Sequence, residues 1–186
     1  MVWLYITLWV FAVLLVYVIT KYNAIVKLRN IRSQSFADVD VQLKLRFDLI
    51  PNLIETVKWY ATHEKETLEN VTKARTSFMN ATGIEDKMQA DNMLTWALKS
   101  LFAVSENYPD LKANQNFLEL QRELTDTENK IQAARRFYNT NVRDFTIATK
   151  HFPSNIVASM FGFKSDAFFE LPEGQEAAKE PVRVNF

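Results

Sequence analysis

Few side chains in this sequence could do covalent or metal chemistry. The chain has two histidines, His63 and His151, and no cysteine, which excludes thiol catalysis, disulfides and metal sites built on thiolates. His63 and Glu64 begin like the zinc-protease pattern His-Glu-x-x-His, but Thr67 stands where the second histidine is needed. The sequence contains no phosphate-binding glycine loop and no nucleophile-elbow motif. We therefore expect no catalytic residue, no metal and no cofactor, and we predict that the protein is not an enzyme.

Polar side chains nevertheless stand at or beside positions that should face the interior of a helical bundle. On the last long helical segment, Gln121, Glu128 and Arg135 recur at a spacing of seven. The full candidate set is Glu64, Arg75, Gln121, Glu128, Arg135 and Tyr138. An unpaired charge inside a protein is very costly, so these groups need partners. Two interpretations stay open: a structural network that fixes helix register, or a polar groove that receives a partner or a small ligand.

The elements that would position these side chains begin with an apolar segment. Residues 2–20 carry no charged side chain, and a helix of this length spans about 28 Å, close to the ~30 Å hydrocarbon core of a bilayer. Aromatic rings stand near both of its ends, as is usual at membrane interfaces. A cleaved signal peptide would need a basic start and a small-residue cleavage site, and a buried core helix is rarely apolar on every face. We therefore predict that residues 1–20 form a transmembrane anchor.

The charges that follow this segment predict its orientation. Four basic residues come before the first acid, Asp38, and form the predicted membrane flank: Lys21, Lys27, Arg29 and Arg32. The positive-inside rule places such a flank in the cytoplasm. We expect a single-pass protein of a cell membrane, with its N-terminus outside and its body in the cytoplasm.

The body after residue 20 has the composition and the punctuation of long helices. Glycine is scarce, with three residues in 186, which argues against β-rich and nucleotide-binding α/β folds. Pro51 should kink or restart a helix because it lacks an N–H donor, and Thr82 with Glu85 could form a capping box. The predicted helices span residues 21–48, 51–80, 86–107 and 110–151. Short loops between consecutive helices predict antiparallel neighbours.

The last of these helices carries the strongest heptad pattern. Six large apolar or aromatic residues recur every seven positions: Phe117, Leu124, Ile131, Tyr138, Phe145 and Phe152. Smaller residues such as Ala134 and Ala148 alternate with them, as in the seam of a helical bundle. The predicted fold class is therefore all-α, with an N-terminal transmembrane helix, a long up-and-down four-helix bundle, a short C-terminal helix and an extended tail.

The sequence changes character at Pro153. Ser154 could cap a short helix that Gly162 ends. Four aromatic residues beyond it make the segment too apolar for a wholly solvated tail: Phe161, Phe163, Phe168 and Phe169. They could pack back on the bundle, or they could contact a partner or a lipid surface. The predicted domains are the anchor (1–20), the bundle (21–152), and the short helix with its tail (153–186).

Several stretches of this sequence resemble the LemA family. They are YNAIVKLRN (22–30), DVDVQLKLRFDLIPNLIETVKWYATHEKETLENVTKAR (38–75), AVSENYPDLKANQNFLELQRELTDTENKIQAARRFYNTNVRDF (103–145), FPSNIVASMFGF (152–163) and the closing PVRVNF. The resemblance implies a single-pass bacterial membrane protein with a short outside N-terminus, a helical bundle and no established enzymatic activity. It also implies that polar positions such as Arg46 are typical of the family. Trp59 departs from the pattern, since many relatives have a small residue there.

Residues and resemblance together favour a non-enzymatic scaffold or adaptor at the bacterial inner membrane. We expect the bilayer as a partner, self-association into a homo-oligomer, and contacts with other membrane proteins. Basic and acidic side chains balance at 22 each, so we expect no general attraction to nucleic acid. Two alternatives remain. One is a membrane-bound sensor or ligand-binding module. The other is a membrane-shaping protein, since one branch of the family is tied to intracellular membrane compartments and the basic flank could contact anionic lipid.

Overall fold

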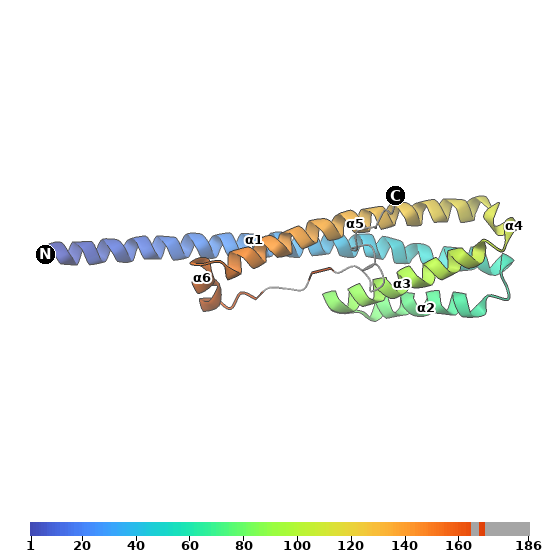
Figure 1. Ribbon diagram of the computed structural model, residues 1–186, viewed down its shortest axis with the longest axis horizontal. Coiled ribbons are helices and arrows are strands. Elements are labelled where there is room, and N and C mark those ends of the chain that lie inside the picture. The colour runs from blue at the N-terminus through green and yellow to red at the C-terminus, as the bar shows by residue number, and fades with distance from the viewer. Residues whose placement is uncertain (165–167, 170–186) are drawn as a thin grey trace, which may run out of the picture. The chain divides into compact units, whose positions relative to one another are not determined.

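The computed structural model describes residues 1–164 and 168–169, and every regular element in these residues is an α-helix. In chain order they are α1 (Val2–Tyr60), α2 (Lys65–Asn80), α3 (Ile84–Ser105), α4 (Pro109–Lys112), α5 (Gln115–Lys150) and α6 (Ser154–Met160) (Figure 1). The all-α fold class is thus confirmed. Most of the predicted tail, residues 165–167 and 170–186, lies outside the described part of the chain.

Helix α1 contains the predicted anchor and continues past it without a break. It is 59 residues long, so its axis extends over roughly 88 Å at 1.5 Å per residue. Its most apolar 18-residue window has a mean hydropathy of 2.5, and none of that window is buried inside the protein. An apolar helix with no protein around it has the length and composition to cross a membrane, and its exposure argues against the core-helix alternative.

The predicted break at Pro51 is wrong, because α1 runs through this proline to Tyr60. Proline cannot donate the backbone hydrogen bond of its turn, which costs about 3 kcal/mol in a helix interior. The helix persists because Ile50, Leu53 and Val57 around the proline are all buried and keep this stretch packed. The chain turns instead at residues 61–64, where neither glycine nor proline marks a turn in the sequence.

Helices α2 and α3 form an antiparallel pair joined by residues 81–83. Figure 1 shows them side by side. Gly83 precedes the first residue of α3, and no side chain caps this end, so the predicted capping box of Thr82 and Glu85 is wrong. The acidic Glu85 and Asp86 still lie in the first turn, where the helix dipole favours negative charge.

The predicted helix 110–151 is divided into α4 and α5. The interruption falls at residues 113–114, and the Asn114 side chain caps the start of α5. Its Oδ1 accepts a hydrogen bond of 3.0 Å from the backbone N–H of Phe117, which is the usual N-cap arrangement. Asparagine at this position therefore defines where the long helix α5 begins.

The chain forms two compact units, and α1 and α5 contribute to both. Unit 2 contains residues 40–132 and begins again at Phe169, which is buried. Within it the end of α1, α2, α3 and the start of α5 follow one another with reversals of direction, as expected for an up-and-down bundle. Its buried apolar side chains come from all four helices and include Leu43, Leu53, Val71, Leu94, Leu101, Phe117 and Leu124.

Unit 1 contains residues 1–39 and 133–168. Its buried cluster consists of Ile25 on α1, Phe145 on α5, and Val157 and Ala158 on α6. Gly162 ends α6 as predicted, with a φ of 68° that suits glycine and backbone bonds from Gly162 to Ser159 and from the following residue to Ala158.

The prediction of Ser154 as a cap is wrong in detail. Ser154 is the first residue of α6, and the position before it is Pro153, which makes no side-chain capping bond. The Ser154 hydroxyl instead donates to the carbonyl oxygen of His151 at 2.8 Å.

We expect Pro51→Ala to raise the melting temperature of the full-length protein in detergent. The melting temperature is measured by far-UV circular dichroism. Alanine restores an N–H donor in the middle of α1, but Pro51 is half-buried and some packing is lost, so the expected gain is about 1–2 kcal/mol. Asn52→Ala is the control for helix propensity alone. A lower melting temperature for Pro51→Ala would show that packing of the proline ring outweighs the missing hydrogen bond.

Candidate functional site

Unit 2 buries the charge of Arg46 on α1, which is 5% exposed. Its Nη1 lies 2.9 Å from Oδ1 of Asp91 on α3 and donates a hydrogen bond to it. The same nitrogen donates to Oγ1 of Thr95 at 3.2 Å and lies 2.8 Å from Oε2 of Glu128 on α5. The approach to Glu128 is an ion pair by distance but is not aligned as a hydrogen bond. One guanidinium thus links three helices, and we call Arg46, Asp91, Thr95 and Glu128 the Arg46 cluster.

The electrostatics of this cluster follow from burial. Burial lowers the pKa of Arg46 from its ordinary value, and the Glu128 carboxylate opposes that shift. Asp91 is fully buried, whereas the Glu128 side chain is 31% exposed. A buried ion pair gives little net stability against an apolar replacement of both partners, but removing one partner leaves a costly buried charge. The arrangement therefore suits a device that fixes the register of helices and offers no reacting group to a substrate.

The structure does not gather the predicted polar set into one site. Glu128 alone of that set belongs to the Arg46 cluster. Glu64 lies after the end of α1 and accepts a hydrogen bond of 3.1 Å from the hydroxyl of Tyr108. Arg75 is half-exposed on α2, and Gln121 is exposed on α5.

Tyr108 and Glu64 form a second polar contact of unit 2. Partial burial of the ring, followed by the hydrogen bond to Glu64 and its negative charge, raises the pKa of Tyr108. The pairing joins the turn after α1 to the turn before α4, so its role is to hold two connections together.

Two members of the predicted set, Arg135 and Tyr138, belong to unit 1. Tyr138 is fully buried, and its ring meets that of Phe36 edge to face at a centroid distance of 5.8 Å. Arg135 is half-buried on α5. Tyr138 is therefore a packing residue of the α1–α5 seam, as the heptad pattern predicts.

The predicted membrane flank lies along α1 after the apolar segment. Lys21, Lys27 and Arg29 are exposed, whereas Arg32 is half-buried. The guanidinium carbon of Arg32 lies 4.8 Å from the ring centroid of Phe145, a cation–π contact. Three members of the flank are thus available to headgroups, and the fourth contributes to packing.

The spacing of charges in the sequence did not lead us to predict the ion pair between Arg46 and Asp91. A signal was present, because Arg46 follows Leu43 by three residues and precedes Ile50 by four, on a stripe that is otherwise apolar. Asp91 likewise precedes Leu94 by three residues and Leu98 by seven, which is the spacing of an apolar helical stripe. A charge of each sign inside an apolar helical stripe is the pattern of a buried ion pair.

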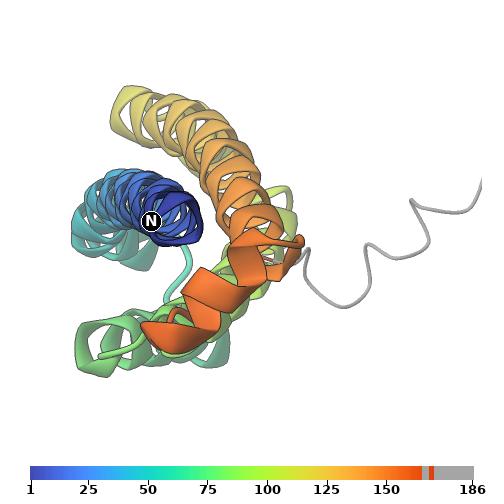
Figure 2. The ribbon, with the colours of Figure 1, turned by 90° about the vertical axis from the view of Figure 1, so that its left-hand side faces the viewer.

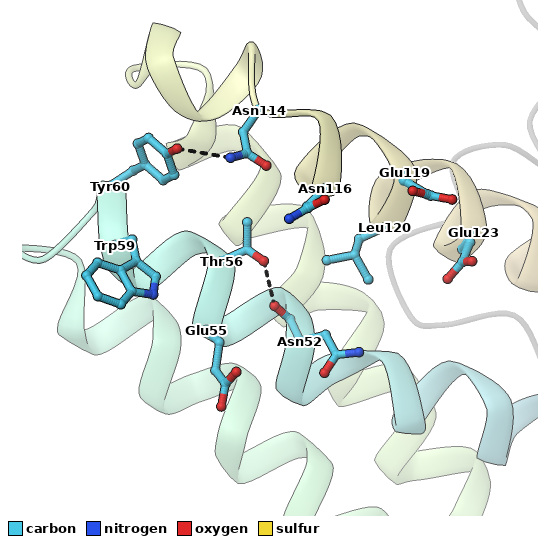
Figure 3. Close-up of a pocket in the computed structure, with 10 residues that line it drawn as sticks. All are labelled: Asn52, Glu55, Thr56, Trp59, Tyr60, Asn114, Asn116, Glu119, Leu120 and Glu123. Carbon is cyan, nitrogen blue, oxygen red and sulfur yellow. Dashed lines mark hydrogen bonds between the residues drawn. The ribbon is translucent and has the colours of Figure 1, made fainter.

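An open groove of about 800 Å³ lies in unit 2 between the end of α1 and the start of α5 (Figure 3). It is lined by Asn52, Glu55, Thr56, Trp59, Tyr60, Asn114, Asn116, Glu119, Leu120 and Glu123. We call it the α1–α5 groove. At one end the Asn114 amide donates a hydrogen bond of 3.0 Å to the Tyr60 hydroxyl, which ties the two walls together.

The chemistry of the α1–α5 groove is acidic and aromatic. Among the residues that the structure describes, its lining includes the carboxylates of Glu55, Glu119 and Glu123 and no basic side chain. Trp59 is 85% exposed, so the face of its indole is open to a ligand. Carboxylates beside an open aromatic ring favour organic cations. No group of three or more His, Asp or Glu side chains within residues 1–164 and 168–169 is placed to hold a metal ion.

Comparison with known proteins shows which family this chain resembles. A family model described as the LemA family matches residues 35–186. Protein LemA of Metamycoplasma hominis is 30% identical over 135 residues, which cover 70% of this chain and 60% of that protein. Magnetosome protein MamQ of Magnetospirillum gryphiswaldense and magnetosome protein MamQ 1 of Paramagnetospirillum magneticum are each 23% identical over 181 residues, or 83% of this chain and 66% of theirs. The matched region thus spans no more than about two thirds of these relatives.

We expect Arg46→Met to lower the stability of the full-length protein by about 3 kcal/mol or more, because it leaves the Asp91 carboxylate buried without its guanidinium. Glu128→Gln should cost less, since Glu128 is partly exposed. Melting in detergent measures both, and Lys44→Met, an exposed site on the same helix, is the control. A melting temperature for Arg46→Met equal to that of Lys44→Met would contradict a structural role of the cluster.

Proposed function

Because this chain belongs to the LemA family, and because its first helix combines an apolar span with a bundle helix, we propose that it is a membrane-tethered scaffold or adaptor rather than an enzyme. The observation that carries the proposal is the continuity of α1 from Val2 to Tyr60. A scaffold of this kind functions through its location at the membrane and through the partners that it binds there.

The tether is supported by the apolar window of α1, none of which is buried inside the protein. We place the span in the inner membrane of a bacterium, with the N-terminus outside and the chain after the span on the cytoplasmic side. The support for this orientation is the excess of exposed basic residues directly after the span, such as Lys21, Lys27 and Arg29.

The non-enzymatic part of the proposal is supported by what the buried polar groups do. Arg46, Asp91 and Glu128 contact one another, and Glu64 contacts Tyr108. Side chains committed to each other in this way hold helices together and are poorly placed to act on a substrate.

Self-association is supported by the outer face of the α2–α3 pair in unit 2. Met93 and Trp96 on α3 are 46% and 51% exposed, and they line a shallow groove of about 380 Å³ with Ala74 and Ala97. Large apolar side chains with small neighbours are typical of contact surfaces, and tryptophan is frequent among residues that carry binding energy. We propose that a second copy of this chain covers the groove.

The expected result for self-association is a concentration-dependent oligomer of the full-length protein in detergent, measured by sedimentation. Trp96→Ala should weaken the association at least tenfold, since truncating a central tryptophan commonly costs 2 kcal/mol or more. Trp59→Ala, another exposed tryptophan of unit 2, is the matched control and should leave the association unchanged. A monomer at every concentration would exclude self-association, and equal effects of both variants would exclude this surface.

The α1–α5 groove favours a second candidate function, a membrane-bound module that binds an organic cation. Three glutamates supply the negative charge, and Trp59 supplies an open aromatic face. A quaternary ammonium group would contact the indole and the carboxylates together. Ligand binding of this kind is compatible with a scaffold role, because the groove and the face of Met93 and Trp96 have separate lining residues.

Choline is the probe for this second function. We expect it to raise the melting temperature of the full-length protein relative to sodium chloride at equal ionic strength, since a ligand of the folded state stabilises it by about 1.4 kcal/mol at ten times its Kd. Trp59→Ala and Glu119→Gln should abolish the shift, whereas Trp96→Ala should keep it. A shift that persists in Trp59→Ala would place binding elsewhere, and no shift at all would exclude a choline-like ligand.

A further inference from the structure

Helix α6 is a short apolar element that packs within unit 1. Residues 152–163 carry no charged side chain. Val157 and Ala158 of α6 are buried against Ile25 of α1 and Phe145 of α5. The C-terminal end of α6 adds aromatic contacts, since the ring of Phe161 lies 4.6 Å from that of Tyr22. Helix α6 is therefore firmly seated on α1.

The part of α1 that receives α6 is the end of the apolar segment. Tyr17 and Val18, which precede Lys21, pack against the same buried cluster. Tyr22 meets the rings of both Phe161 and Phe163. Helix α6 thus contacts α1 at the point where the uncharged segment ends and the basic flank begins.

Helix geometry fixes the depth of this contact. Residues 2–20 are long enough to fill the hydrocarbon core of a bilayer. Tyr22 lies two residues beyond Thr20, or about 3 Å along the axis, and the interfacial layer of each leaflet is about 5–7 Å thick. A helix packed on Tyr17, Val18 and Tyr22 lies at the level of the lipid headgroups when α1 spans the membrane.

The direction of α6 agrees with this position. In Figure 1 α6 lies beside α1, and in the end-on view of Figure 2 it extends across α1 instead of along it. A helix that crosses a membrane-spanning helix runs along the membrane surface. This is the orientation of amphipathic helices that bind at the interface.

The face of α6 turned away from the buried cluster is apolar and exposed. Ile156 and Met160 are 52% and 68% exposed, and the preceding Phe152 is 79% exposed. Ile156 and Met160 are spaced by four and lie on one face of α6, whereas Phe152 lies in the turn that precedes the helix. The exposed Lys150 and Lys164 flank this segment in the sequence, and Lys21 follows the span on α1. Apolar side chains rimmed by cations are what an anionic lipid surface binds.

We propose that α6 is an interfacial foot, which inserts Ile156 and Met160, together with the preceding Phe152, into the leaflet where α1 leaves the membrane. The foot gives the protein a second contact with the bilayer and fixes the rotation of α1 about its own axis. The inference rests on the membrane span of α1 and does not depend on the proposed scaffold role.

Spin labels on single cysteines test the foot, because the natural chain has no cysteine that would compete for the label. The full-length variants Met160→Cys and Ile156→Cys are labelled and reconstituted at one copy per nanodisc of mixed phosphatidylcholine and phosphatidylglycerol. Collision with oxygen, which concentrates in lipid, is compared with collision with a water-soluble nickel complex. Met79→Cys on α2 is the matched control, since Met79 is 67% exposed, almost the same as Met160.

We expect the ratio of oxygen collision to nickel collision at residues 160 and 156 to be at least several-fold higher than at the control residue 79. A reference label at Val13, in the apolar segment of α1, should show a similarly high ratio. Nickel access at residue 160 equal to that at residue 79 would overturn the proposal. Low access to both reagents would also overturn it, since it would mean that protein covers α6. Water access at Val13 would overturn both the span and the foot. None of these outcomes alters the sedimentation result that tests the scaffold role.

Discussion

The rest of this structure depends on one continuous ladder of backbone hydrogen bonds. Helix α1 passes from the apolar segment into the bundle with no turn between Thr20 and Lys21, so the membrane span and the body share one rigid element. A backbone inside lipid has to satisfy its own polar groups, which a helix does. The same helix then supplies Leu43, Leu53 and Val57 to the core of unit 2, so one element serves both the apolar segment and the bundle.

Long helices packed by apolar stripes have a specific weakness, which the Arg46 cluster addresses. Apolar side chains tolerate sliding by a helical turn, because the new contacts resemble the old ones. A guanidinium on α1 that has to meet carboxylates on α3 and α5 has one acceptable register, since any slip leaves charges buried without partners. The cluster therefore specifies one arrangement of the helices in unit 2 even where it adds little net stability. Such a restraint matters most when a helix as long as α1 enters the packing.

The sequence allowed the fold class and the long helices to be predicted, because hydrophobic periodicity and hydropathy are local signals. The positions at which helices break were harder to predict than the helices themselves. Pro51 suggested a break that burial of its neighbours prevents, whereas the actual turn at residues 61–64 has no glycine or proline. Among the candidate polar residues, Tyr138 and Glu128 have interior or paired roles, but Gln121 is exposed and Arg75 half-exposed. The partner of each charge depends on which helix lies opposite, and single-chain spacing does not contain that information.

The apolar C-terminal segment packs partly on the protein, as one of the two interpretations predicts, while its contact with lipid stays a proposal. Phe163 packs on the buried cluster of unit 1 and Phe169 is buried, while Phe161 remains 51% exposed beside Tyr22. Packing thus fixes one side of the segment and leaves another side apolar and open. On a freely soluble protein that open side would be a liability, because exposed apolar surface promotes association. At the interfacial position that we propose for α6, headgroups and acyl chains would cover the same surface, which makes it favourable there. The position of α6 on α1 explains why the sequence carries apolar residues there on more than one face.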